Sequence, residues 1–274
     1  MAFRLKTLYN FILYGSANSG AFLEKSVNRN EVGEMREFAL ITGASGGIGQ
    51  AIAAELAARG YHLYLHYNTN MEAVEHLSAR LSGHGGEYVP VQADFSKQGG
   101  YKELLPNLVG VNAIVHCGGT GAYGLFQDIE DEEAESLFNI HVLNPILLTK
   151  ELIPELLKKK TGSVIFISSI WGQTGAACET VYSAAKGAQI SFVKALGKEL
   201  APSGIRVNAI APGAVETPML AGFTPEELAG LSDDIPMGRL GRPEEIANAA
   251  AFLLSGQASY ITGHILSVNG GWYT

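Results

Sequence analysis

The sequence TGASGGIG fills residues 42–49, between the apolar run Phe38–Ile41 and a helical pattern of apolar residues at Ile48, Ile52 and Leu56. Glycines at a strand-to-helix turn let the chain bend tightly and bring free backbone N–H groups and a helix N-terminus against a phosphate. A glycine-rich turn alone is weak evidence, because its ordinary alternative is a flexible loop. Between a strand and a helix, the spacing predicts a pyrophosphate site formed by Gly43, Ser45, Gly47, Ile48 and Gly49.

Short apolar strands alternate with helical patterns along the rest of the chain. Strands that alternate with helices are joined by right-handed crossovers and form a parallel sheet covered on both faces. The sequence therefore predicts an α/β fold with a doubly wound, seven-stranded parallel sheet, the Rossmann fold, in a single domain. The predicted strands are Phe38–Ile41, His62–His66, Tyr88–Gln92, Ala113–His116, Val164–Ile167, Val207–Ile210 and Ile265–Val268.

The composition limits the classes of function. The 274 residues are 47% hydrophobic, enough for the core of an α/β domain, and the formal net charge is −8. We therefore expect no nucleic-acid partner. No apolar stretch approaches the ~18 residues of a spanning helix, so we expect no membrane segment. Cys117 and Cys178 show neither metal-ligand nor disulfide spacing, which indicates a reducing, cytoplasmic environment and no metal site.

Residues 1–34 differ in composition from the rest of the chain. They hold Arg4 and Lys6, an apolar patch from Leu8 to Tyr14, and then a stretch rich in Ser, Asn and Gly. A targeting peptide would suit this charge asymmetry, but the apolar run is short and is interrupted by Asn10. We expect a disordered or loosely docked N-terminal extension over residues 1–34 and a folded domain over residues 35–274.

Three further motifs lie at the expected ends of strands. Asp94 follows the third strand, and ISSIWGQTGAACETVYSAAK, residues 167–186, places Ser169 thirteen residues before a Tyr-x-x-x-Lys pair. RVNAIAPGAVETPM, residues 206–219, holds a Pro-Gly pair and a threonine. Together with TGxxxGxG at residues 42–49, these motifs make residues 36–273 resemble the short-chain dehydrogenases/reductases, most closely the 3-oxoacyl-acyl-carrier-protein reductase subgroup of fatty acid metabolism.

The resemblance implies an oxidoreductase that transfers a hydride between a nicotinamide cofactor and a small-molecule carbonyl or alcohol. It makes residues 35–274 the NAD(P)-binding catalytic domain, and it implies a homotetramer or homodimer because relatives commonly associate. Besides the phosphate loop, it assigns cofactor contacts to Asp94, Gly118, Tyr182, Lys186, Pro212, Gly213 and Thr217.

The residue types fit this chemistry. Tyr182 and Lys186 are four residues apart at the start of a predicted helix, so their side chains share one face. We expect a nearby cation to lower the pKa of Tyr182 from its usual ~10 into a range useful for proton transfer. Ser169 can donate to the substrate oxygen as negative charge develops. Singly, each residue has an ordinary packing explanation, but together, at the ligand-binding ends of parallel strands, they predict the catalytic group.

The segment after the fourth strand departs from the family pattern. His116, Cys117, Gly118 and Gly119 replace the family's Asn-Asn-Ala-Gly. This change keeps the final glycine beside the cofactor. It removes the asparagine side chain that braces the sheet, so we expect weaker local order there.

A second departure places His141 where the family has a fourth catalytic residue, an Asn whose main chain helps to hold a water beside the catalytic lysine. We expect His141 to take this role through its main chain. Alternatively, its imidazole relays protons and adds a limb near pH ~6.5 to the rate profile. A packing histidine is the third possibility, and a one-residue shift of the alignment would instead give the role to Asn139 or Asn144.

The end of the second strand bears on the choice of cofactor. LYLHYNTN, residues 63–70, places Tyr67 where NAD-specific relatives typically carry an acid. No acid repels a 2′-phosphate there, and Asn68 and Thr69 could hydrogen-bond one. However, Gly46 stands where many NADP-binding relatives have Arg, and no Lys or Arg closely follows Tyr67. We expect NADP(H), with NAD(H) less favoured.

The connection over residues 216–239 mixes acidic residues with Pro218, Met219, Leu220, Phe223 and Met237, a composition typical of a lid over an apolar substrate. The basic residues with which acyl-carrier-protein reductases grip their acidic carrier correspond to Asp128 and Ser203 here, so carrier docking is disfavoured. A free or coenzyme A-linked 3-oxoacyl compound and an unrelated small ketone both stay open as substrates.

Two other functions compete with catalysis of this kind. A catalytically weak NADP(H)-binding sensor on the same fold is disfavoured by the intact Ser169, Tyr182 and Lys186, although His141 argues for it. Use of Ser169 as a hydrolytic nucleophile lacks a matching His–acid pair.

Overall fold

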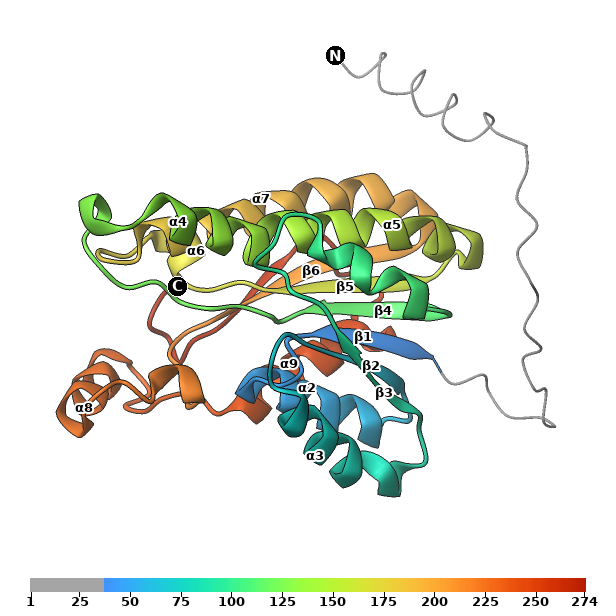
Figure 1. Ribbon diagram of the computed structural model, residues 1–274, viewed down its shortest axis with the longest axis horizontal. Helices are drawn as coiled ribbons and strands as arrows, with labels where there is room; N and C mark the ends of the chain where they lie inside the picture. Colours follow the sequence, from blue (N-terminus) through green and yellow to red (C-terminus); the bar gives the residue numbers. More distant parts are fainter. Residues whose placement is uncertain (1–36) are drawn as a thin grey trace, which may run out of the picture. The chain divides into compact units, whose positions relative to one another are not determined.

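The computed structural model describes residues 37–274 and contains one seven-stranded, all-parallel sheet with the strand order β3-β2-β1-β4-β5-β6-β7 (Figure 1). The predicted doubly wound Rossmann fold is confirmed. The expected extension over residues 1–34 and the start of the domain at residue 35 lie outside the described residues and stay predictions.

All seven predicted strands are present, and their bounds move by at most two residues. The strands are β1 Phe38–Thr42, β2 His62–Tyr67, β3 Tyr88–Gln92, β4 Val111–His116, β5 Gly162–Ile167, β6 Ile205–Pro212 and β7 Ile265–Val268. The α-helices of the described part are α2 Gly47–Ala58, α3 Met71–Leu81, α4 Asp131–Phe138, α5 Asn144–Lys159, α6 Trp171–Thr174, α7 Thr180–Leu200, α8 Pro225–Asp234 and α9 Pro243–Leu254.

The helices form a layer on each face of the sheet (Figure 1): α2, α3 and α9 on one face, and α4, α5 and α7 on the other. Successive strand residues point to opposite faces. In β1, Ala39 and Ile41 pack toward the layer of α2 and α9, whereas Leu40 packs toward α5 and α7. Both faces are therefore apolar, which explains the nearly uninterrupted apolar runs of the central strands.

The register of β1 and β4 brings two loops together. Thr42, the last residue of β1, pairs with His116, the last residue of β4. The Thr42 hydroxyl accepts hydrogen bonds from the N–H groups of Cys117 at 3.2 Å and Gly118 at 3.3 Å. The chain proceeds to β2 on one side of β1 and later to β4 on its other side, so this point is the topological switch where open α/β sheets bind ligands.

Two polar side chains of β6 anchor the last strand. Asn208 is fully buried, and its amide donates to the Ile261 carbonyl at 2.9 Å and accepts from the His264 N–H at 3.0 Å. The Arg206 guanidinium donates to carbonyls at the end of α9, including that of Leu254 at 2.9 Å. These bonds fix the connection that leads from α9 into β7.

We predict that Asn208→Leu lowers the free energy of unfolding by about 2–4 kcal/mol, because two backbone groups lose their partners and each unpaired buried group costs about 1–3 kcal/mol. Urea denaturation of the full chain measures the change. Ser259→Ala, at an exposed residue of the same connection, is the control and should match the wild type. Equal midpoints for Asn208→Leu and the control would contradict the anchoring role.

Candidate active site

The phosphate loop needs glycine at two of its predicted positions. Gly43 has φ +69°, and a Cβ there would lie 2.4 Å from the Cα of Gly118. A Cβ on Gly49 would lie 2.2 Å from the carbonyl oxygen of Gly43. The turn therefore folds tightly on itself and ends at the N-terminus of α2, whose first free N–H groups suit a bound phosphate.

The structure brings the other predicted cofactor residues to this loop. A Cβ on Gly47 would lie 2.9 Å from the methyl group of Thr217, so the segment after β6 touches the loop. The Ser45 carbonyl accepts from the Gln50 amide at 3.0 Å, and Ile48 packs against the core. The Pro212 carbonyl accepts from the backbone of the catalytic segment, Ile170 N–H, at 3.0 Å, and the Gly213 N–H donates to the carbonyl of Val268 at 3.1 Å.

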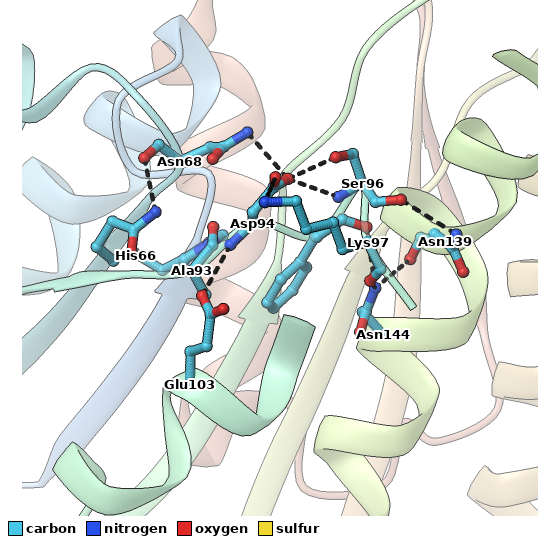
Figure 2. Close-up of polar contacts among 11 residues, drawn as sticks. His66, Asn68, Ala93, Asp94, Ser96, Lys97, Glu103, Asn139 and Asn144 are labelled. Carbon is cyan, nitrogen blue, oxygen red and sulfur yellow. Dashed lines mark hydrogen bonds and ion pairs between the residues drawn. The ribbon is translucent and has the colours of Figure 1, made fainter. Parts of the chain in front are cut away.

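The ends of β2 and β3 form a polar cluster around Asp94 (Figure 2). The Asp94 carboxylate accepts from the Ser96 hydroxyl at 2.6 Å and the Asn68 amide at 3.3 Å, and its second oxygen lies 3.2 Å from Lys97 Nζ. The Ser96 hydrogen bond, followed by the charge and hydrogen bond of Lys97, holds the pKa of Asp94 below its usual value. The predicted Asn68 and Asp94 thus lie together, beside Lys97, a cation that the sequence analysis missed.

Two asparagines connect this cluster to the helices on the other side (Figure 2). Asn144 is fully buried, and its amide donates to the carbonyls of Phe95 and Lys97, both at 2.9 Å. The Asn139 amide donates to the carbonyl of Ser96 at 3.1 Å. Both side chains therefore hold the loop after β3 and are committed to the backbone there.

His66 is a second residue that the sequence analysis missed. Its buried ring accepts the Gly43 N–H at Nδ1, 3.1 Å away, and Nε2 lies 3.0 Å from the carbonyl oxygen of Ala93. These two bonds require the neutral ring with its hydrogen at Nε2. Burial lowers the pKa of His66 to about 4, so the ring is neutral near pH 7. His66 thus connects the turn of the phosphate loop to Ala93, the residue before Asp94. The signal for His66 in the sequence was a polar residue inside an otherwise apolar strand.

The predicted catalytic residues meet at the C-terminal ends of the strands. Ser169 follows β5, and its hydroxyl is hydrogen-bonded to that of Tyr182 at the start of α7. Lys186 Nζ donates to the Ile167 carbonyl at 2.8 Å and lies 5.4 Å from the centroid of the Tyr182 ring. Ser169 and Lys186 are buried, so the group is largely shielded from water.

Burial sets the protonation states of this group. It raises the pKa of Tyr182 above its ordinary value, and the charge of Glu179 adds to the rise, whereas the Ser169 hydrogen bond opposes it. The expected lowering by a nearby cation is therefore wrong for the protein by itself, because desolvation of the phenolate dominates. Burial lowers the pKa of Lys186 to about 8. Near pH 7 the phenol keeps its proton and the ammonium is mostly charged, which suits proton donation to a carbonyl oxygen.

His141 lies in a π-helical turn, Asn139–Leu143, between α4 and α5. Such turns often occur at functional sites. The His141 ring stands edge-on to that of Tyr182, with centroids 5.4 Å apart and an interplanar angle of 90°. The structure thus brings His141, and neither Asn139 nor Asn144, to Tyr182. Burial, with the Lys186 charge, lowers the pKa of His141 to about 3, so this ring does not produce the limb near pH ~6.5 that the alternative of an imidazole relay implies.

His116 provides a brace at the position where we expected one to be lost. Its ring Nε2 lies 2.8 Å from the Thr149 hydroxyl oxygen, and that hydroxyl donates to the Pro145 carbonyl at 2.8 Å. Since the hydroxyl hydrogen is used on Pro145, Nε2 of His116 is the donor. The imidazole therefore links β4 to α5. At the next residue, burial raises the pKa of Cys117 to about 12, so its thiol stays protonated.

The connection over residues 216–239 contains α8, which begins with a capping box between Thr224 and Glu227. The apolar side chains expected to face a substrate are exposed here: Met219 by 57%, Phe223 by 41% and Met237 by 69%. A cavity of about 330 Å³ lies beside this connection, but its lining includes none of the catalytic residues.

The comparison with protein families agrees with this geometry. The family described as enoyl-(acyl carrier protein) reductase matches residues 43–273, which include the phosphate loop and the catalytic group. The chain belongs to the short-chain dehydrogenases/reductases. It is therefore an oxidoreductase of a family that uses nicotinamide cofactors on small-molecule substrates.

Relatives cover nearly the whole described part. An uncharacterised oxidoreductase of Bacillus subtilis, YmfI, is 54% identical over 241 residues, which are 87% of this chain and 100% of that protein. The 3-oxoacyl-[acyl-carrier-protein] reductase FabG of Escherichia coli is 37% identical over 86% of this chain and 97% of its own length. The FabG of Staphylococcus epidermidis is 32% identical over 87% of this chain and 100% of its own length.

The described residues also bear on metal binding and on membrane insertion. Within residues 37–274, no three His, Cys, Asp or Glu side chains are grouped so as to hold a metal ion. Among the helices of these described residues, none is long and apolar enough to cross a membrane.

We predict that His66→Leu weakens NADPH binding about five- to thirty-fold, because the Gly43 turn and the Ala93 strand end lose bonds worth about 1 kcal/mol each. Titration of NADPH fluorescence measures the dissociation constant. His62→Leu is a matched control: His62 lies at the opposite end of β2 and accepts the Glu87 N–H at 2.9 Å. Equal affinities of the two variants would show that His66 does not order the loop for the cofactor.

Proposed function

We propose that this oxidoreductase reduces a ketone to a hydroxyl group, with NADPH as the hydride source. The observation that carries the proposal is the group of Ser169, Tyr182 and Lys186 beside the glycine turn, in which Ser169 and Lys186 are buried and the phenol is protonated near pH 7. The glycine turn fits the cofactor, because the close packing at Gly43 and Gly49 leads the chain tightly into the N-terminus of α2, whose free N–H groups suit a pyrophosphate. When bound, the nicotinamide supplies the hydride.

Each catalytic side chain has one task in this reaction. The carbonyl carbon receives the hydride, and the carbonyl oxygen receives the proton of the Tyr182 hydroxyl. Ser169 donates a hydrogen bond to that oxygen while its negative charge develops. The ammonium of Lys186, held by the Ile167 carbonyl, stabilises the phenolate left on Tyr182.

The end of β2 supports NADP(H) over NAD(H). Tyr67 is buried and uncharged, so no acid repels a 2′-phosphate at the end of the strand. Asn68 lies within hydrogen-bond distance of Asp94, whose other oxygen pairs with Lys97. Lys97 offsets the charge of Asp94, so this end of the site presents no net negative charge to the 2′-phosphate.

The charges around the site argue against an acidic carrier of the substrate. The segments that follow β4, β5 and β6, residues 118–135, 168–185 and 213–242, hold twelve Asp and Glu residues and only two arginines, of which Arg239 is paired with Glu245. Such a rim repels an acidic carrier protein. A free 3-oxoacyl compound or another small ketone therefore fits the site better, even though the FabG relatives are named for carrier-linked substrates.

We also propose a homotetramer or homodimer, as the family resemblance implies, in a reducing cytoplasmic compartment. The segment after β4 supports association, since it exposes Tyr123 by 80%, Leu125 by 55% and Phe126 by 68%. Large apolar side chains clustered at a surface are typical of interfaces.

We predict that Tyr182→Phe lowers the rate of ketone reduction by about 10²–10⁴-fold, because the ring still packs but has no proton to transfer. The affinity for NADPH should stay nearly unchanged. The assay follows NADPH oxidation over a panel of small ketones and 3-oxoacyl thioesters. Tyr123→Phe, at an exposed tyrosine, is the control. Full activity of the Tyr182 variant would refute the mechanism, and an inactive wild type over the whole panel would refute ketone reduction.

We predict tighter binding of NADPH than of NADH, and a reversal of this preference in Asn68→Asp, where a carboxylate would repel the 2′-phosphate. Fluorescence titration of both cofactors with both proteins measures the four dissociation constants. An additional Lys97→Met variant should lose affinity for NADPH more than for NADH. A wild type that prefers NADH would overturn the assignment of the cofactor.

A further inference from the structure

One face of α7 carries more than the catalytic pair. Tyr182, Lys186 and Gln189 are spaced i, i+4 and i+7, so their side chains lie along one stripe of the helix. The π-helical turn of His141 packs along this stripe: its ring meets Tyr182, and its main-chain carbonyl accepts the Gln189 amide at 2.7 Å. His141 and Gln189 are 1% and 2% exposed. Gln189 thus holds the turn that faces the catalytic tyrosine.

The hydrogen bonds fix the orientation of both side chains. Because Gln189 donates to a carbonyl, its nitrogen must point at His141 and its Oε1 must point away. His141 Nε2 lies 2.8 Å from the carbonyl oxygen of Thr120, so the ring hydrogen is on Nε2 and Nδ1 keeps a lone pair; the Thr120 N–H lies farther from Nε2, at 3.3 Å. Gln189 Oε1 and His141 Nδ1 are both buried acceptors without a hydrogen-bond partner among the described residues.

A buried acceptor without a hydrogen bond lowers the stability of the fold, and a buried water molecule normally supplies the missing donor. The positive charge of Lys186 acts on His141, and Lys186 is one helical turn before Gln189. Its ammonium has three donors, one of which binds the Ile167 carbonyl. Lys186 therefore lies near both side chains that carry these acceptors, and Thr120, which the His141 ring contacts, is exposed.

The proposed reaction requires that protons return to Tyr182. Each ketone reduced removes one proton from Tyr182, and the buried phenolate must recover a proton from solvent before the next turnover. In the family, the main chain at the position of His141 helps to hold the water beside the lysine. Here the carbonyl of His141 accepts a hydrogen bond from Gln189, which leaves it one lone pair. The unpaired Gln189 Oε1 and His141 Nδ1 are further acceptors available to a water molecule.

We propose that Gln189 is a positioning residue for the return of protons to Tyr182: its amide nitrogen holds the His141 turn, and its Oε1, together with His141 Nδ1, binds a water molecule beside Lys186. The inference rests on the proposed ketone reduction. The phenolate gains a proton from the side of Lys186, the water replaces the proton on the lysine, and solvent at Thr120 replaces that of the water. No electrons move in these steps.

The kinetic test compares two variants of the full chain. Gln189→Met keeps the length of the side chain but can neither donate nor accept, and it should lower kcat about ten- to a hundred-fold, within the range typical of acid–base catalysis. KM for NADPH should not change, and the solvent deuterium isotope effect on kcat should rise because proton return becomes slow. Gln189→Glu keeps acceptor oxygens, so it should retain more of kcat than the Met variant.

The pH profile separates this role from a structural one. Lys186, with its pKa lowered by burial to about 8, should give the wild type an alkaline limb near that pH. A carboxylate in Gln189→Glu favours the charged ammonium and should move the limb upward. Gln257→Met, at an exposed glutamine, is the control for the substitution. Wild-type kcat and isotope effect in Gln189→Met, or equal losses of kcat and NADPH affinity in both Gln189 variants, would overturn the proposal.

A high-resolution crystal structure tests the water without any substrate. We expect an ordered water bonded to both Gln189 Oε1 and His141 Nδ1 in the wild type, and no such water in Gln189→Met. A wild-type site in which no water touches both atoms would overturn the inference, whichever ketone the enzyme reduces. A wild type inactive on every ketone would instead overturn the proposed function, while the crystal structure still decides about Gln189.

Discussion

The close contact between two backbone turns, at Gly43 and Gly118, is the constraint on which the active site depends. β1 and β4 are neighbours in register, so the turns after them leave the sheet at the same level. A Cβ on Gly43 would lie 2.4 Å from the Cα of Gly118. The next residue is Gly119, which lies against the Cε1 edge of the His141 ring. A Cβ on Gly119 would lie 2.3 Å from Cε1. One short turn thus touches the phosphate loop on one side and the catalytic helices on the other.

Three buried histidines extend this arrangement from the turn to its surroundings. His66 bonds the phosphate loop to the end of β3, His116 bonds β4 to α5, and His141 bonds its π-helical turn to Thr120. Burial lowers the pKa of each ring far enough to keep it neutral near pH 7. A neutral imidazole has one donor and one acceptor, so it can connect two backbone segments without placing a charge in the core.

The electrostatics of the site come from burial more than from pairing. Desolvation raises the pKa of Tyr182 and lowers that of Lys186, so it moves the two pKa values apart. The phenol therefore keeps its proton near pH 7 in the protein by itself, as the proposed proton donation requires. The acidic rim outside the site acts at longer range, on which substrates approach.

The sequence by itself determined the fold and indicated the candidate catalytic group. Short apolar runs locate the seven strands. The spacings of Gly43, Ser169, Tyr182 and Lys186 are local patterns that can be recognised in the sequence alone. Such features are readable because strand burial and helical periodicity depend on neighbours in the chain. In the loop after β3, the sequence indicated only Asp94 as a site residue. The side chains that hold this loop, Asn139 and Asn144, are distant in the chain.

Only the tertiary structure decided which residues surround that group and in which protonation state. Lys97, His66 and Gln189 act through partners from 3 to 48 positions away in the chain, and no local pattern marks the distant ones. The expected lowering of the Tyr182 pKa failed for the same reason, because desolvation depends on how completely other segments cover the phenol. Burial is a property of the whole fold, so neither the choice between His141 and its neighbouring asparagines nor the charge of the site could be settled before the helices were packed.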